Sequence, residues 1–170
     1  LDFQATLETK PEKAIKLEKD ALAQIETITA DNARLVSNLH ANLGGLYRMN
    51  AHPDLAREHM EKSISLLDQF NLLHINDSIP QIANYAMFLT KQQEPERGIS
   101  ELQKLSGIIK EYHSDDCLDY AKVQETLGTI YLMTANLPQA KTHFKRAFKI
   151  YEKIWADEPE MIEAKYQEIQ

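Results

Sequence analysis

The chain has 170 residues, of which 43% are hydrophobic and 26% charged, enough apolar material for one globular domain with a sizeable core. Its 26 acidic residues outnumber its 19 basic residues for a net charge of −7, which argues against nucleic acid as a partner because phosphate binding needs a basic surface. No apolar run approaches the roughly 20 residues of a membrane span and no signal-peptide pattern is present, so we expect a cytoplasmic chain that makes no membrane contact.

Small residues recur along the chain at steps of 42 residues, which indicates an internal repeat. One series consists of Gly44, Ala86 and Gly128, and a second consists of Ala14, Ala56, Gly98 and Ala140. Proline stands three residues before three members of the second series, at Pro11, Pro53 and Pro95. It suits the first turn of a helix, where its missing N–H is not needed.

In chain order, the repeat divides the sequence into predicted helix pairs. Residues 1–29 form a partial first repeat that begins partway through its first helix. Three full repeats follow at 30–71, 72–113 and 114–157, and residues 158–170 start a further repeat or form a capping helix. In the first full repeat, apolar residues at three- and four-residue steps predict an amphipathic helix through Leu35, Leu39, Leu43 and Tyr47. No strand alternation is present, so the predicted fold class is all-α.

The repeat unit resembles the tetratricopeptide repeat, which has a Leu-Gly-x-x-Tyr core in its first helix and Ala-x-x-x-aromatic in its second. The last full repeat carries this arrangement at Leu127, Gly128, Tyr131, Ala140 and Phe144. The tryptophan typical of the family is replaced by His40, Ile82 and Gln124. The 42-residue period is longer than the common 34 and is similar to the repeats of kinesin light chain and of several bacterial peptide-sensing regulators. The resemblance implies a right-handed α-solenoid of antiparallel helix pairs over residues 1–170, which we interpret as a fragment of a longer protein.

The recurring glycines are expected to mark where the two helices of a pair pass close together. Gly44 would face Ala56, Ala86 would face Gly98, and Gly128 would face Ala140. In the middle pair the first-helix residue is larger by a methyl group and the second-helix residue is smaller by one. A close contact between the two residues would tolerate this exchange, because their combined volume is unchanged.

No residue pattern for catalysis is present, and we expect neither an enzyme nor a bound cofactor or metal. The six histidines are scattered without ligand spacing, and there is no glycine-rich phosphate loop. The single cysteine, Cys117, is interpreted as an inert small residue. Lys141, Lys145 and Lys149 lie four residues apart and are interpreted as a solvated helix face.

The resemblance implies that the first helix of each pair lines the concave face, where a peptide would bind. The candidate binding residues are Asn38, Asn42, Arg48, Met49, Asn84, Met87, Lys91, Lys122, Thr126 and Met133. A ladder 42 residues apart, Asn42, Asn84, Thr126 and Glu168, would let asparagine amides clamp a peptide backbone. The alternatives are that these asparagines bond neighbouring helices or face water, and that the methionines fill the core.

The predicted function is non-catalytic binding of a peptide or protein segment in this groove. Arg48, Lys91 and Lys122 favour a ligand with an acidic group or a free carboxylate, although Glu125 and Glu168 argue against a uniformly basic groove. One alternative is the peptide-sensing regulatory domain of a larger transcription regulator or signalling protein. Another is a structural scaffold that associates with itself through its terminal repeats.

Overall fold

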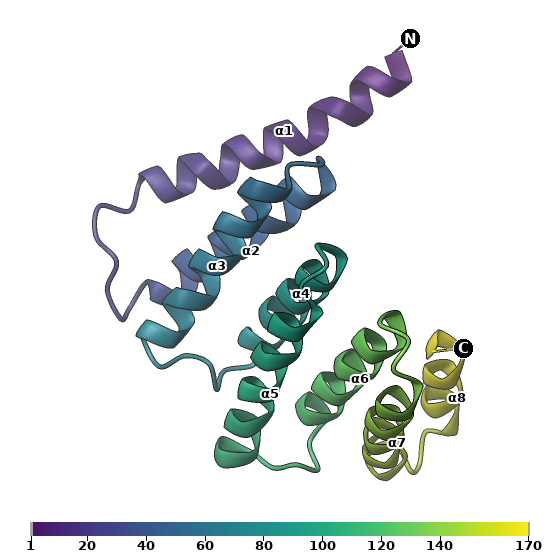
Figure 1. The fold of residues 1–170 in the computed structure, drawn as a ribbon. Coiled ribbons are helices and arrows are strands. Elements are labelled where there is room, and N and C mark those ends of the chain that lie inside the picture. Colours follow the sequence, from purple (N-terminus) through teal and green to yellow (C-terminus); the bar gives the residue numbers. More distant parts are fainter. Residues whose placement is uncertain (1, 170) are drawn as a thin grey trace. The chain divides into compact units, whose positions relative to one another are not determined.

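The computed structural model describes the backbone of residues 2–169 and the side chains of residues 11–167, and over this range every regular element is a helix (Figure 1). The helices are α1 (Asp2–Ala23), α2 (Ala33–Met49), α3 (Pro53–Gln69), α4 (Ser78–Lys91), α5 (Pro95–Tyr112), α6 (Leu118–Met133), α7 (Leu137–Ile154) and α8 (Pro159–Ile169). They divide into two compact units, residues 1–81 and 82–170, and the boundary falls within α4.

The first unit is built on the pairing of α2 and α3, with α1 packed along α2. Leu43 and Val36 of α2 meet Leu67 and Ala56 of α3 in a core where each side chain is at most 2% exposed. The buried residues of each helix recur at three- and four-residue steps, so burial of one apolar stripe on each helix explains the pairing.

The second unit repeats this arrangement with α6 and α7, and α5 packs on α6. Leu127 and Ile130 of α6 are fully buried, as are Leu102 and Leu105 of α5. The second helices α3, α5 and α7 begin at positions 53, 95 and 137, which are 42 residues apart as the sequence predicts.

The turn inside each full helix pair has one conformation. Ala51, Gln93 and Ala135, again 42 residues apart, are left-handed, with φ of 57°, 65° and 58°. The following N–H donates five residues back: His52 to the Tyr47 carbonyl at 2.9 Å and Asn136 to the Tyr131 carbonyl at 2.8 Å. These bonds cap the end of the first helix, so the chain can turn before the second.

The N-terminal helix departs from the expected pairing. α1 runs through Pro11 without a break, although Pro53 and Pro95 each begin a helix. The residue equivalent to Ala51 and Gln93 is Thr9, and the backbone there stays helical instead of making the left-handed turn. Without that turn, the first helix is not ended before the proline.

Gly44, Gly98 and Gly128 mark close contacts between the two helices of a pair. A Cβ on Gly98 would lie 2.7 Å from the Ala86 carbonyl oxygen. One on Gly44 would lie 2.6 Å from the Met60 side chain and 3.3 Å from the Ala56 carbonyl oxygen. A Cβ on Gly128 would come closest to the Phe144 ring, at 2.8 Å, so the nearest neighbour of Gly128 is Phe144 rather than the expected Ala140. Phe144 stands one turn beyond Ala140 and its ring lies over the glycine.

Cys117 has a structural role that the sequence interpretation did not include. It is the N-cap residue of α6, where its Sγ accepts a hydrogen bond from the Tyr120 backbone N–H at 3.4 Å. Sulfur thus replaces the oxygen that usually satisfies a free N–H at a helix start.

Candidate binding surfaces

The predicted site residues on α2 are partly used in bonds within the first unit. Asn38 donates to Asp77 Oδ2 at 3.3 Å and accepts from Gln81 Nε2 at 2.6 Å. Gln81 Oε1 in turn accepts from Ser37 at 2.9 Å and from Ser63 at 2.5 Å. This network ties the start of α4 to α2 and α3, so the Asn38 amide is engaged on both its donor and its acceptor side.

Asp77 is held in this network as an anion. Arg34 Nε donates to its Oδ2 at 2.6 Å, and this hydrogen bond, helped by the one from Asn38, lowers the pKa of Asp77 below its usual value. The carboxylate therefore remains charged as it fixes the Asn38 side chain.

The remaining predicted residues of α2 point outward. The Asn42 amide donates to Glu18 Oε1 of α1 at 3.0 Å, while Arg48 is exposed and Met49 is 71% exposed. Asn42 thus bonds a neighbouring helix, which was the alternative considered for the asparagine ladder.

On α4 the predicted residues are more accessible. Asn84 and Lys91 are exposed, and Met87 is half-buried. The other side of the helix is anchored by Ala86 and Leu89, neither of which is exposed to solvent. The Asn84 side chain makes no hydrogen bond to any part of the chain that the structure describes, so its amide can donate and accept toward a ligand.

On α6 the predicted residues show mixed surroundings. Lys122 is exposed, with its Nζ 3.7 Å from Asp119 Oδ1, and Met133 is 48% exposed. The Thr126 hydroxyl donates to the Lys122 carbonyl at 3.0 Å, within its own helix. Thr126 therefore offers a ligand less hydrogen-bonding capacity than Asn84.

Of the two glutamates that argue against a uniformly basic groove, Glu125 is paired within the second unit. Glu125 Oε2 accepts from the Tyr151 hydroxyl at 2.5 Å, and its Oε1 pairs with Lys165 Nζ at 3.0 Å. Its negative charge is thus compensated within the second unit. The Glu168 side chain lies outside the described residues.

The structure brings together histidines that spacing alone did not connect. His40 Nδ1 lies 2.8 Å from His59 Nδ1, and the Tyr47 ring stacks on His59 with centroids 5.4 Å apart. Two repeats later the equivalent residues form the same contact, since His143 Nδ1 lies 2.9 Å from Gln124 Oε1. In both pairs the two residues are 19 positions apart, which was the signal available in the sequence. His40 and Gln124, which stand in place of the family's tryptophan, thus each bond a histidine of the following helix.

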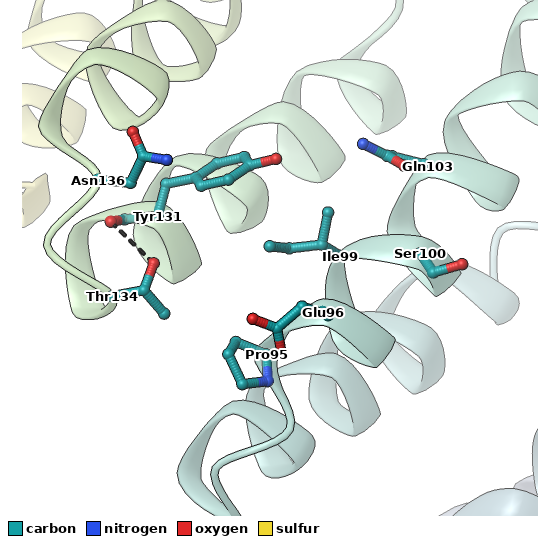
Figure 2. Close-up of a pocket in the computed structure, with 8 residues that line it drawn as sticks. All are labelled: Pro95, Glu96, Ile99, Ser100, Gln103, Tyr131, Thr134 and Asn136. Carbon is teal, nitrogen blue, oxygen red and sulfur yellow. Dashed lines mark hydrogen bonds between the residues drawn. The ribbon is translucent and has the colours of Figure 1, made fainter.

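A hollow of about 450 Å³ lies in the second unit between α5, the end of α6 and the turn to α7. Figure 2 shows the Tyr131 ring extending from α6 above Ile99, with its hydroxyl directed toward Gln103. Polar groups of Glu96, Ser100 and Asn136 complete the lining. None of these α5 residues was predicted, because the resemblance directs attention to first helices. The hollow offers hydrogen bonds but contains no histidine, cysteine or lysine.

Two further findings concern the described residues only. No helix among them is long and apolar enough to cross a membrane. They include no cluster of three or more His, Cys, Asp or Glu side chains placed to hold a metal ion.

Comparison with known proteins identifies the repeat class. Residues 78–153 match the model of the tetratricopeptide repeat family. The predicted class is thereby confirmed: this part of the chain is made of tetratricopeptide repeats, a fold that generally serves protein–protein interaction and is typically non-catalytic. A search of curated proteins finds no match.

Solved structures extend the same fold over most of the chain. BtubC (BKLC) from P. vanneervenii is similar at a TM-score of 0.74 and 20% identity, over 87% of this chain and 58% of that one. A Podosopora anserina kinesin light chain-type protein with nearly identical TPR-like repeats has a TM-score of 0.72 and 14% identity, over 86% of this chain and 70% of that one. A single-substitution variant of that protein has a TM-score of 0.74 and 13% identity, over 88% of this chain and 70% of that one. The predicted all-α solenoid of the kinesin light chain-like type is confirmed as the fold.

Proposed function

We propose that the chain is a non-catalytic module that works in the cytoplasm and binds a peptide or protein segment through the first helices of its repeats. In the second unit the proposed surface consists of Asn84, Met87 and Lys91 on α4 with Lys122, Thr126 and Met133 on α6; it is called the first-helix surface below. Arg48 and Met49 extend the proposal to α2 in the first unit.

The observation that carries this proposal is that the Asn84 side chain is exposed and has no hydrogen-bond partner among the described residues. Its exposed amide has no internal partner in the described chain, while the buried side of the same helix fixes its position. The helix thus presents the amide with its donor and its acceptor both available to an extended backbone, and no backbone rearrangement of the chain is needed.

Charge favours an acidic ligand. Lys91 and Lys122 are exposed, and Glu125 is already compensated by Lys165. An acidic side chain or a free carboxylate near the Lys91 ammonium group would gain attraction without leaving a charge unpaired, whereas at Lys122 it would share the ammonium group with Asp119.

The experiment begins with a randomised peptide library selected on the chain, and the enriched peptide is titrated by calorimetry. We expect acidic residues in it, and a loss of affinity of about tenfold or more for Lys91→Glu and of severalfold for Asn84→Ala. Arg48→Glu tests the α2 part separately.

Lys16→Glu on α1 provides the control, because it makes the same charge change at an exposed position outside the proposed surface. If Lys91→Glu and Asn84→Ala bind the peptide as Lys16→Glu does, the first-helix surface is not the binding site.

A further inference from the structure

A small hollow of about 230 Å³ lies in the first unit, where the end of α1 and the segment after it meet α2 and α3. Most of its lining is apolar, and one histidine and one lysine complete it: Leu22, Ile25, Ile28, Val36, His40 and Lys62. It is called the His40 hollow below. Apolar walls with a few polar groups are the usual form of a small-molecule site.

The two polar residues of the His40 hollow carry groups without a partner. His40 is 5% exposed, and its bond to His59 uses Nδ1, so Nε2 has no hydrogen-bond partner among the described residues. When Nδ1 accepts that bond, Nε2 carries the proton of the neutral ring and is a donor. Lys62 is exposed and has no carboxylate within ion-pairing distance in the same part of the chain. The hollow thus offers an N–H and an ammonium group, and its lining contains no carboxylate to pair with them.

In the second unit, the basic residue equivalent to Lys62 does have an oxygen acceptor. Two repeats after His40 and Lys62 stand Gln124 and Arg146. Arg146 Nη1 donates to Gln124 Oε1 at 3.4 Å. The imidazole ring of His40 provides no oxygen, so Lys62 lacks the acceptor that Arg146 has.

The amide nitrogen of Gln124 also has a partner that the first unit lacks. It donates to Ser106 Oγ at 3.2 Å. The residue equivalent to Ser106 is Leu22, whose side chain cannot accept a hydrogen bond. Nε2 of His40 is therefore without the hydroxyl that serves Gln124, and the Leu22 side chain lines the hollow instead.

We propose that the His40 hollow binds a small aliphatic carboxylic acid in its ionised form. One carboxylate oxygen accepts from His40 Nε2 and the other pairs with the Lys62 ammonium group, so the ligand supplies the acceptors that the second unit holds in its own side chains. The aliphatic chain lies among Leu22, Ile25 and Ile28. Because a water molecule takes up about 30 Å³ in the liquid, the hollow holds roughly eight non-hydrogen atoms, as many as hexanoate contains.

Hexanoate is the probe, titrated into the chain while NMR follows the His40 ring and the methyl groups of Ile25 and Ile28. We expect saturable shifts at all three residues. Hexanol has the same number of carbons but no charge, so it should bind about tenfold more weakly or less. The site is independent of the first-helix surface, and Lys91→Glu should leave the hexanoate affinity unchanged.

Lys62→Glu is the test variant. It should reduce the hexanoate affinity about tenfold or more, because it replaces the attraction for the carboxylate by repulsion. Arg146→Glu is the matched control, since it reverses the charge at the equivalent position of the second unit and should leave the affinity unchanged. Both side chains are exposed, so the core stays intact, and circular dichroism checks that the helices remain.

His40→Ile tests the second donor. Isoleucine stands at the equivalent position of the intervening repeat, Ile82, where it is buried. The variant keeps the apolar walls and removes the Nε2 donor, so the affinity should fall severalfold. If His40→Ile does not fold, Lys62→Glu with its control still decides the proposal.

Three results would overturn the proposal. Equal affinities for hexanoate and hexanol would show that the hollow selects only an apolar chain. An unchanged affinity in Lys62→Glu, or an equal loss in Arg146→Glu, would place the binding elsewhere. Binding of N-acetylleucine, a model of a peptide C-terminus, in the absence of hexanoate binding would make the occupant the end of a protein chain rather than a free acid.

Discussion

His40 and His59 face each other through their Nδ1 atoms at 2.8 Å, so one ring nitrogen must be unprotonated and accept the bond. Burial, together with the charges of His59 and Lys62, lowers the pKa of His40 to about 4. Burial likewise lowers the pKa of His59. The pair is thus neutral at pH 7 and resists protonation while the first unit is folded.

This pair predicts a pH dependence of stability. The unfolded chain takes up a proton at His40 below pH 6.5 and the folded chain only near pH 4, so the free energy of unfolding should fall as pH drops through that window. Between pH 7 and 5 the expected loss from His40 is about 2 kcal/mol, measured by urea denaturation.

His40→Gln is the matched variant, because it reproduces the Gln124–His143 contact of the second unit. It should fold normally at pH 7 and lose less stability on acidification than the original chain. An unchanged pH profile in this variant would show that His40 does not carry the effect.

Asn38 and Asn84 illustrate what a residue pattern leaves open. Both were predicted to face a ligand, but Asn38 is bonded to Asp77 and Gln81, which are 39 and 43 residues further along the chain. Those partners depend on how α4 begins beside α2, which local periodicity does not encode. The predicted site residues therefore lie on the expected helices. Whether each side chain is available to a ligand depends on its tertiary contacts, which the sequence pattern does not give.

Among the structural elements, the left-handed turn explains both the regular pairs and the exception. Ala51, Gln93 and Ala135 adopt it at the end of α2, α4 and α6, whereas α1 continues through Pro11. The 42-residue period predicted where the second helices begin. The small-residue pattern did not indicate that the first turn would be missing, because it carries no information on where the backbone leaves the helix.

Ala135→Gly should stabilise the chain by about 0.5–1 kcal/mol, because glycine adopts a φ of 58° without the steric cost that alanine bears. Thermal or chemical denaturation measures the gain. Ala164→Gly in α8 is the opposite control and should cost about 0.5–1 kcal/mol, since it removes a helix-favouring residue. A loss of stability from both variants would contradict the turn geometry.

The contact between α4 and α5 makes a second prediction for paired helices. Gly98→Ala would place its Cβ 2.7 Å from the backbone oxygen of Ala86, which cannot rotate away, so we expect a loss of about 1–3 kcal/mol.

Gly107 lies on the same helix with nothing within 4 Å of a Cβ placed there. Gly107→Ala should therefore gain about 0.5–1 kcal/mol through helix propensity alone. Urea midpoints compare the two variants directly. Equal effects would show that helix propensity rather than the close contact sets the cost at Gly98.

For the molecule as a whole, the repeat explains the helix-pair architecture, in a fold that generally serves protein–protein interaction. The period, the packing glycines and the tetratricopeptide class could be predicted from sequence because each repeat applies the same local constraints again. The His40–His59 pair and the α5 hollow could not, because each depends on side chains from helices that meet only in the folded unit. The α7 lysines show this most clearly: their spacing predicted a solvated face, and the structure places two of them beside an apolar hollow.

The central claim is that a peptide ligand contacts the first helices α4 and α6. Five methionines, Met49, Met60, Met87, Met133 and Met161, place methyl probes on α2, α3, α4, α6 and α8. Methyl NMR of the chain titrated with the selected peptide reads all five at once. The account predicts that Met87 and Met133 shift while buried Met60 and Met161 of α8 do not. Saturation of binding with Met87 and Met133 unmoved would contradict it.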